Sequence, residues 1–384
     1  MPFYLAAKEI VRNKSRFFAV CGVIGLITLL VLFIAALGEG LAQAGKQYIE
    51  NLDAELLVYQ EGVDFSIPAS RLGRGTLNSI GRVPGVAAVG PLGFSVGAVL
   101  IGEGENVQKV DVSLIGVEPG LPGAPIVFAG QPLISRRANE VVLDQNFLAQ
   151  NNIPIGETIQ LRVTQGTEEK IYKLVVVGHT TGKQYSFLPG LFVPMLTWDK
   201  IRPQGEGVAN DLVFNVAAVR LENAAEREIM GERIASVVRN VEATDLVTAY
   251  EAVPGYTAQQ STVNTQKGFT LLIAVLVIGG FFQIQTLQKV GQIGMLKAIG
   301  ASNWLVGVTL VAQVVLTTII GITLGGTAAW LLSLALPPGI PIQFQGPAIV
   351  TAVVSLLAIG PIGGLVSVRT LLKVEPLTAL GLGI

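Results

Sequence analysis

Four long apolar runs constrain the fold of this chain more than any other feature. They cover residues 17–41, 266–285, 303–334 and 348–368 of the 384. A helix that crosses the ~30 Å hydrocarbon core of a bilayer needs about 20 apolar residues, and each run reaches roughly that length. Charged residues make up only 14% of the chain, against about 25% in soluble proteins. The sequence therefore predicts a multi-pass membrane protein. The first run exceeds the ~7–15 apolar residues of a signal peptide, and we expect it to be retained as a helix.

The basic residues predict the orientation of these spans. Cytoplasmic segments next to membrane spans carry an excess of Lys and Arg. Segment 335–347, between the third and fourth runs, has no charge at all. Both termini (1–16 and 369–384) and segment 286–302 are therefore expected in the cytoplasm, and segment 42–265 outside. The basic residues on which this rests are Lys8, Arg12, Lys14, Arg16, Lys289, Lys297, Arg369 and Lys373.

The outside segment, residues 42–265, has the patterning of a folded α+β domain. Residues 223–239 have helical character, with Asn223 as a possible cap and with Ile229, Ile234 and Val237 expected on one face. The predicted fold is thus that of an α-helical membrane protein with four transmembrane helices and a large α+β extracytoplasmic domain between the first and second helices. Strand-like patterns occur at 141–148, 157–164 and 170–179.

Several kinds of chemistry lack their residues in this chain. There is one cysteine, Cys21, and one histidine, His179, so neither an intrachain disulfide nor a multi-histidine metal site can form. We expect Cys21 to be an apolar filler and His179 to be hydrogen-bonded locally rather than to ligate iron. The two Gly-Lys pairs, at Lys46 and Lys183, are each followed by Gln instead of Ser or Thr, so no phosphate-binding loop is present. We predict no catalytic residue, no metal site and no intrinsic cofactor, and a net charge of −1 gives no indication of nucleic-acid binding.

Segment 286–302, TLQKVGQIGMLKAIGAS, carries two lysines and no acid. A plain loop that satisfies the topology rule would account for the charge. It would not account for the near-helical spacing of the apolar residues. A short amphipathic helix at the membrane surface, offering Ile293, Leu296 and Ile299 to the groove of a partner, accounts for both. Gly300 would then end this helix.

This segment resembles the coupling loop of MacB/FtsX-type ABC transporter permeases. Gln292 stands where many members of that family carry Glu. The opening residues LAAKEIVRNKSRF and the order of one span, a large outside domain and three spans are also similar, so the resemblance covers the whole chain. The matching coupling residues are Lys289, Gln292, Ile293, Gly294, Leu296, Lys297, Ile299 and Gly300, and those of the C-terminal pattern are Arg369, Glu375, Pro376, Ala379 and Leu380.

The resemblance implies a permease subunit in the bacterial cytoplasmic membrane. ATP would be hydrolysed by a separate ABC ATPase subunit, and the permease would pass the motion to its outside domain. Four spans are few for an enclosed path, so a homodimer is expected. A regulator of a cell-wall hydrolase, as in FtsX-like proteins, is the alternative to a transporter.

A narrower resemblance links the chain to the haem-exporting permeases of this family. It lies in VPGYTAQQSTVNTQKGF, EGLAQAG, SIPASRL and GKQYSF, and it implies haem as a possible substrate, with Tyr185 and Tyr256 as candidate ligands. Glu39, at the outer end of the first span, is a third candidate. Structural roles compete with each of these: packing for Tyr185, interfacial anchoring for Tyr256 and simple solvation for Glu39. Export of lipid, lipoprotein or antimicrobial peptide stays open.

Overall fold

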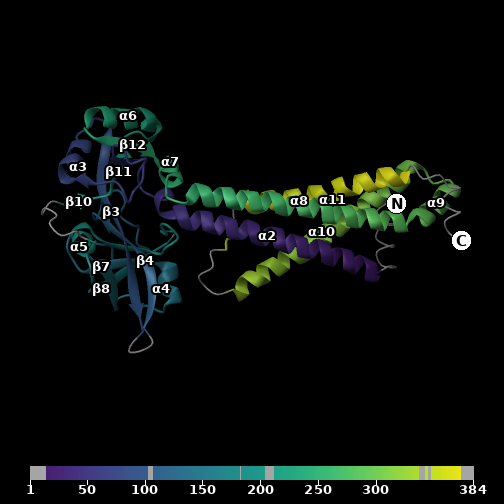
Figure 1. Cartoon of the computed structure of the whole chain (residues 1–384), viewed down its shortest axis with the longest axis horizontal. Helices are drawn as coiled ribbons and strands as arrows, with labels where there is room; N and C mark the ends of the chain where they lie inside the picture. The colour runs from purple at the N-terminus through teal and green to yellow at the C-terminus, as the bar shows by residue number, and fades with distance from the viewer. Residues whose placement is uncertain are drawn as a thin grey trace. The chain divides into compact units, whose positions relative to one another are not determined.

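A computed structural model of the chain describes residues 14–102, 107–181, 183–203, 212–336, 342–344 and 347–372. It divides into two compact units (Figure 1). The helical unit comprises residues 1–41 and 260–384, and the sheet domain comprises residues 42–259. Two calls fall outside the description: the N-terminal segment up to residue 13, and the C-terminal residues Glu375, Pro376, Ala379 and Leu380. Arg369 lies in a helix, but its side chain is not described.

The four predicted apolar runs all lie in helices. Three described helices are long and apolar enough to cross a membrane, over Phe17–Glu50, Tyr256–Gln288 and Asn303–Ala335. In the fourth, the described apolar stretch is the shorter Ile349–Gly360, so the fourth crossing stays a prediction. The helices involved are α2 (Lys14–Glu50), α8 (Tyr256–Gln288), α10 (Asn303–Ala335) and α11 (Pro347–Leu372), with the short α9 (Val290–Ala298) between α8 and α10.

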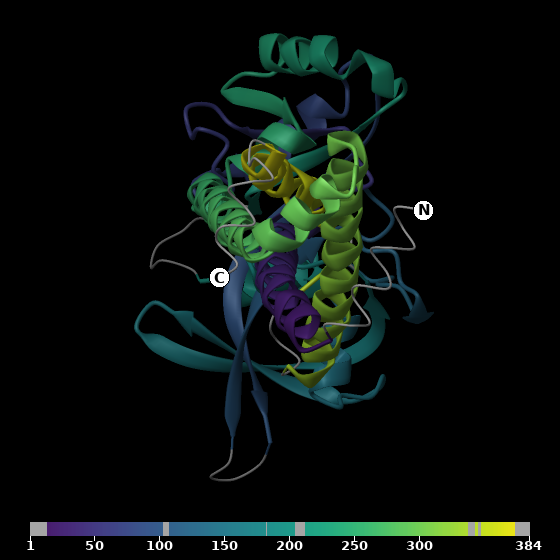
Figure 2. The ribbon, with the colours of Figure 1, turned by 90° about the vertical axis from the view of Figure 1, so that its right-hand side faces the viewer.

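Small residues let α2 and α10 pack closely within the helical unit (Figure 2, purple and yellow-green). A methyl group added at Gly321 would lie 2.6 Å from Ile24 Cβ, and one added at Gly325 would lie 2.6 Å from Thr28 Cβ. Such close backbone approach is how helices gain van der Waals contact in a lipid environment. Cys21 is buried in the same region as a free thiol, in agreement with its predicted role as a filler.

The sheet domain is built on one large mixed sheet. The hydrogen-bonded order is β12-β1-β11-β3-β4-β9-β6-β8-β5, with β7 paired to β3 and β8, and β10-β2 form a separate pair. The β4–β9 and β6–β8 pairs are parallel and the other pairs antiparallel. The strands are β1 Leu56–Gln60, β2 Leu72–Gly73, β3 Val86–Ile101, β4 Gln108–Val117, β5 Ala129–Gly130, β6 Glu140–Asp144, β7 Thr158–Gln165, β8 Glu168–Thr180, β9 Gly190–Pro194, β10 Val213–Phe214, β11 Val216–Leu221 and β12 Val241–Asp245. The helices are α3 Arg74–Ile80, α4 Gln145–Gln150, α5 Met195–Ile201, α6 Arg227–Val237 and α7 Leu246–Glu251, with a 3₁₀ turn at Ala224–Glu226.

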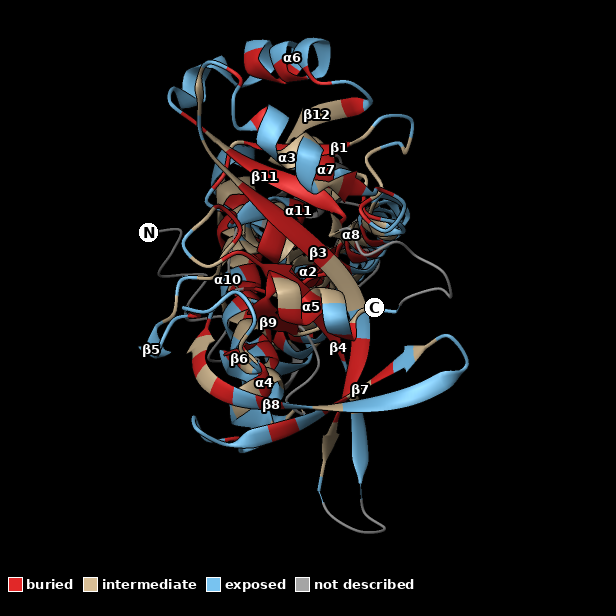
Figure 3. Ribbon diagram, turned by 90° about the vertical axis from the view of Figure 1, so that its left-hand side faces the viewer, coloured by how far each residue is buried: buried red, intermediate tan, exposed pale blue. Residues whose placement is uncertain are grey.

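The central strands of this sheet, such as β11, which is red in Figure 3, are buried on both faces, whereas β7 and β8 are exposed over much of their length. Successive residues of a strand point to opposite faces. Leu56 and Val58 accordingly belong to one apolar cluster, and Leu57 and Tyr59 to the other. The second cluster also contains Tyr48, from the last turns of α2. The end of α2 is therefore part of the core of the sheet domain.

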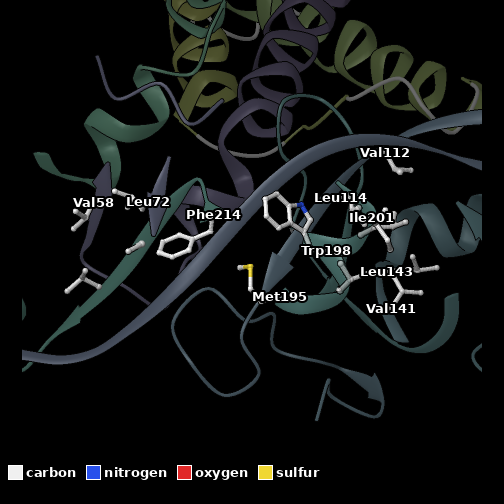
Figure 4. Packing of buried hydrophobic residues seen from close by; sticks show 14 of the residues in the cluster. Val58, Leu72, Val112, Leu114, Val141, Leu143, Met195, Trp198, Ile201 and Phe214 are labelled. Atoms are coloured by element: carbon white, nitrogen blue, oxygen red, sulfur yellow. The ribbon is translucent and has the colours of Figure 1, made fainter. Parts of the chain in front are cut away.

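A facing pair of glycines shapes the first cluster, part of which is drawn in Figure 4. Gly93 of β3 pairs with Gly116 of β4. A Cβ on either residue would come within 2.5 Å of Trp198, so the indole occupies the space that two side chains would otherwise fill. Its Nε1–H donates a hydrogen bond to Ser95 Oγ at 3.0 Å. Only glycine allows this contact between a large ring and the sheet backbone.

Two of the three predicted strands are confirmed as β7 and β8, whereas the third, at 141–148, is only half strand. It ends at Asp144, whose carboxylate accepts a hydrogen bond from the Asn146 N–H at 3.0 Å and so caps α4. An N-cap carboxylate satisfies a donor that the first helical turn leaves open. The sequence VVLDQNFL therefore changes from strand to helix at its aspartate.

The predicted helix at 223–239 is confirmed, but its buried face was predicted wrongly. Asn223 caps the 3₁₀ turn that leads into α6, by accepting from the Ala225 N–H at 3.1 Å. Ile234 is buried, but Ile229 is 60% exposed and Val237 is 62% exposed. The buried face carries Met230 in place of Ile229. Residues 230 and 234 are four apart and lie on one side of the helix, whereas residues 229 and 234 are five apart and lie about 140° apart around it.

Candidate functional site

Segment 286–302 contains the predicted short helix, α9, between α8 and α10. Gly300 follows it with a φ of +100°, a conformation that favours glycine and ends a helix. Ser302 then caps α10, its Oγ accepting a hydrogen bond from the Leu305 N–H at 3.3 Å. The Gly-Ala-Ser end of the motif is therefore a helix stop followed by a helix start, which fixes the turn between α9 and α10.

One side of α9 is occupied by contacts within the helical unit. Ile293 is only 6% exposed and packs in a small apolar cluster with Val306. Gly294 is buried. Lys289, at the N-cap of α9, donates a hydrogen bond from Nζ to Gln313 Oε1 of α10 at 2.7 Å. Ile293 and Lys289 hold α9 on α10.

The other side of α9 is apolar and exposed. Ile299 is 80% exposed and Met295 is 57% exposed. Trp304, at the start of α10, is 81% exposed. Large apolar side chains gathered on an accessible surface are typical of a binding site. We call Met295, Ile299 and Trp304 the outer apolar set.

The structure corrects the predicted binding face of this helix. Ile293 and Ile299 are six residues apart, which is about 240° around a helix of 3.6 residues per turn, so they cannot share a face. Ile293 points to α10 and Ile299 away from it. Gln292 is exposed, Lys297 lies half-buried in the last turn, and the Leu296 side chain is outside the described residues. Trp304 was missed because it lies beyond the helix, although its position two residues after the Ser302 cap places it beside that turn.

The second candidate region is the loop 183–188, which contains Tyr185. This residue is 6% exposed, and its ring lies 4.6 Å from that of Phe94. Its backbone oxygen accepts a hydrogen bond from Ser113 Oγ at 3.0 Å. Burial raises the pKa of Tyr185, so the neutral phenol is strongly favoured over the phenolate that would ligate ferric iron. In this structure Tyr185 is a packing residue.

The same loop is attached to the last turns of α2, and to Asn51 just after it, by four hydrogen bonds. In one of them the Gln184 N–H donates to Gln47 Oε1 at 3.4 Å. The Tyr48 N–H donates to Gln184 O at 2.9 Å, and the Phe187 N–H donates to Ala44 O at 3.2 Å. Lys183 Nζ donates to Asn51 O at 2.5 Å. Burial lowers the pKa of Lys183 to about 8, with Asp53 opposing this shift. Residues 183–187 therefore bind the end of α2 to the sheet domain.

Backbone strain in this loop indicates that its contacts with α2 hold it in one conformation. Ser186 and Phe187 both have positive φ, +51° and +65°. Two consecutive non-glycine residues in this region are costly, at about 1–3 kcal/mol each, and persist only where surrounding contacts impose them. The result is that the ring of Phe187 is directed to the α2 backbone.

Tyr256 and Phe187 both approach Gly45 of α2. The position that a Cβ would occupy on Gly45 lies 3.3 Å from Phe187 Cζ and 3.4 Å from Tyr256 Cδ2. Tyr256 is half-buried at the start of α8, and its ring contacts Tyr250 edge-on at 5.6 Å. Lys46 Nζ lies 5.1 Å from the Tyr250 ring centre.

This grouping of Gly45, Lys46, Phe187, Tyr250 and Tyr256, the aromatic cluster, offers flat apolar surfaces beside one cation. Lys46 also pairs with Glu50 at 3.0 Å. Aromatic faces of this kind suit a planar, apolar ligand. The sequence pointed to Tyr256 alone; Phe187 and Lys46 were missed because only the fold brings them together.

The remaining candidates lie elsewhere. Glu39 is half-buried in α2 and belongs to the helical unit, whereas both tyrosines belong to the sheet domain. His179 lies on β8, and its buried Nδ1 has no hydrogen-bond partner among the described residues. Within the described ranges no group of three or more His, Cys, Asp or Glu side chains could hold a metal ion.

Comparison with known families gives two matches that together span most of the chain. Residues 17–237 match the MacB-like periplasmic core domain, and residues 268–376 match the FtsX-like permease C-terminal domain. The first match covers more than half of the chain.

Individual relatives match over almost the full length. HrtB of Staphylococcus haemolyticus, named as a hemin transport system permease protein, is 25% identical over 98% of this chain and 99% of its own. HrtB of Staphylococcus epidermidis is 26% identical over 99% of both chains. The periplasmic region of MacB from Actinobacillus actinomycetemcomitans is 14% identical over 52% of this chain and 91% of its own, with a TM-score of 0.36.

Proposed function

The chain belongs to the family of MacB-like and FtsX-like ABC transporter permeases, and on this premise we propose that it couples a separate ATPase subunit to motion of its own extracytoplasmic domain. The chain would lie in the bacterial cytoplasmic membrane with both termini in the cytoplasm and would work as a homodimer. ATP is bound and hydrolysed by the partner.

The observation that carries this proposal is the outer apolar set on and beside α9. Ile299 and Met295 are four residues apart, so they lie on one side of the helix, and both are exposed. The opposite side is held on α10 through Ile293 and Lys289. A partner that seats on Ile299 would therefore move α9 and α10 together.

The last turns of α2 are the segment through which motion of the helices would reach the sheet domain. The last turns of α2 carry Tyr48, which is fully buried in the domain core, and the loop at Lys183 fastens them by hydrogen bonds. A displacement of this part of α2 must either break those contacts or carry the sheet with it. Because the contacts are buried, we expect the sheet to follow.

A cysteine cross-link tests the seat of the partner. Ile299→Cys, made in a Cys21→Ser background, is expected to cross-link to a cysteine in the cognate ATPase under mild oxidation, and Leu334→Cys is not. Leu334 is a suitable control because it is 67% exposed and apolar, but lies at the other end of α10. Cross-linking at Leu334 and not at Ile299 would place the ATPase at the wrong end of the spans and contradict the proposal.

We further propose haem as the exported substrate. Two full-length relatives are named for hemin transport, and the aromatic cluster offers a surface suited to a porphyrin with carboxylate groups. Tyr256 can present its phenol oxygen to ferric iron, as tyrosine does in some haem proteins. Tyr185 and Glu39 stay predictions for this role, with Tyr185 weakened by its burial.

Substitution at Tyr256 separates haem binding from packing. Tyr256→Phe keeps the ring against Gly45 and Tyr250 but removes the oxygen. The variant is expected to bind hemin more weakly in a spectroscopic titration, with an unchanged thermal midpoint, whereas Tyr172→Phe on β8 should behave as wild type. If wild-type protein shows no saturable hemin spectrum, export of lipid, lipoprotein or peptide, or regulation of a cell-wall hydrolase, replaces this proposal.

A further inference from the structure

A cavity of about 290 Å³ opens in the helical unit between α2, α8 and α11. Its walls are apolar or small, with Val31 and Ile34 from α2, Leu271 from α8 and Ala352 from α11. The one charged residue among the described lining residues is Lys267 of α8. An apolar cavity with a single cation at its edge has the polarity of an amphiphile: an apolar tail and an anionic head.

Three hydroxyl side chains line this cavity, those of Thr270, Thr351 and Ser355, and the first two are bonded within their own helices. Thr270 Oγ1 donates to Gln266 O at 2.7 Å, and Thr351 Oγ1 donates to Pro347 O at 2.8 Å. Both hydroxyl protons are therefore used within their own helices. The walls offer methyl groups to an occupant, and Lys267 provides the cationic end.

The end of the Lys267 side chain lies beside α2. A Cβ on Gly38 would lie 3.5 Å from Lys267 Cε and 3.7 Å from its Nζ, which are ordinary contact distances. In the described residues Lys267 makes no ion pair, so its charge is available to an occupant of the cavity.

The position of Lys267 in the sequence is unusual for a membrane protein. It precedes the apolar part of α8, at the end of the span that the proposed orientation places outside. Lysines near spans concentrate on the cytoplasmic side, so topology does not account for this one. A lysine near the membrane surface is attracted to anionic lipid headgroups.

We propose that this cavity binds an anionic phospholipid of the outer leaflet, with one acyl chain between α2, α8 and α11 and the phosphate beside Lys267. The volume of about 290 Å³ lies just below the ~300–1,000 Å³ range of ligand pockets, which suits one acyl chain better than a whole tetrapyrrole. The site is separate from the aromatic cluster of the sheet domain. The proposal uses the proposed membrane orientation, but it depends neither on the ATPase nor on haem as the substrate.

Native mass spectrometry of the purified full-length chain tests this inference. Wild-type protein mixed with equal amounts of phosphatidylglycerol and phosphatidylcholine is expected to retain phosphatidylglycerol preferentially. K267Q should lower that retention about five-fold, the effect of one lysine beside an anionic headgroup, and K267R should restore it. Lys173→Gln, the same change at an exposed position on β8, is the matched control and should behave as wild type.

A second variant probes the acyl chain. Ala352→Leu fills part of the cavity and should lower retention of both lipids without changing the preference between them. Equal retention of the two lipids by wild type, or unchanged preference in K267Q, would overturn the proposal. Displacement of the bound lipid by equimolar hemin would also overturn it, because the cavity would then be a substrate site. None of these results bears on ATPase binding, so the proposed function is tested independently.

Discussion

Truncation of the outer apolar set should weaken ATPase binding by a predictable amount. Complete burial of an isoleucine or methionine side chain contributes about 1.5–3 kcal/mol. Ile299 is 80% and Met295 57% exposed, so most of that surface is available to a partner. The double change Met295→Ala and Ile299→Ala should therefore remove roughly 2–4 kcal/mol of binding free energy, which corresponds to a Kd about 30- to 1,000-fold higher.

The assay is equilibrium binding of the purified ATPase to the permease in nanodiscs. The matched control is Leu331→Ala with Leu334→Ala, two residues of α10 that are 58% and 67% exposed and that we expect to face lipid. The thermal midpoint should stay unchanged in both double variants, because none of the four side chains is in a core. Equal affinity of the two double variants for the ATPase would refute the assignment of this surface.

Three further predictions concern the sheet domain and the topology. Burial lowers the pKa of Lys183 to about 8 from its usual 10.5, so between these pH values the folded state binds fewer protons than the unfolded state, and the free energy of unfolding rises with pH. Lys183→Met should remove this rise in urea unfolding curves, and an unchanged pH dependence in the variant would contradict the prediction. Gly93→Ala should lower unfolding free energy by about 1–3 kcal/mol through overpacking against the indole ring, whereas Gly75→Ala, whose Cβ meets no other atom within 4 Å, should not lower it; equal effects would argue against the packing explanation. Cysteine at Glu168 should react with a membrane-impermeant maleimide on intact cells and cysteine at Ser302 should not, and labelling of Ser302 from outside would contradict the proposed orientation.

Much of the helical architecture could be predicted because it depends on local sequence. The apolar runs are continuous, and their helices follow from length and hydropathy. The end of α9 at Gly300 was also predicted, because a glycine after an apolar helical pattern is a local stop signal, whereas the Ser302 cap was not predicted. The position of strand β6 was predicted, but its end was missed, since the role of Asp144 as a cap competes with the strand pattern around it.

The features that could not be predicted depend on which way a side chain points around its helix, or on contacts with residues far away in the sequence. The direction of Ile293 follows from its contact with Val306 in another helix, which spacing alone does not reveal. The approach of Phe187 to Gly45 needs the loop to be fastened on α2, and the space for Trp198 needs two strands to bring their glycines together. Each of these contacts joins segments far apart in the chain.

The most direct test of the account is the ATPase rate of the permease–ATPase complex in nanodiscs as hemin is added. The account predicts a saturable increase with hemin in the wild-type complex. The increase should be weaker in Tyr256→Phe and absent in the double variant at Met295 and Ile299, because the first change acts on substrate binding and the second on coupling. A rate that does not respond to hemin in any of the three, while lipid or peptide stimulates it, would contradict haem as the substrate; full stimulation in the double variant would contradict coupling through α9.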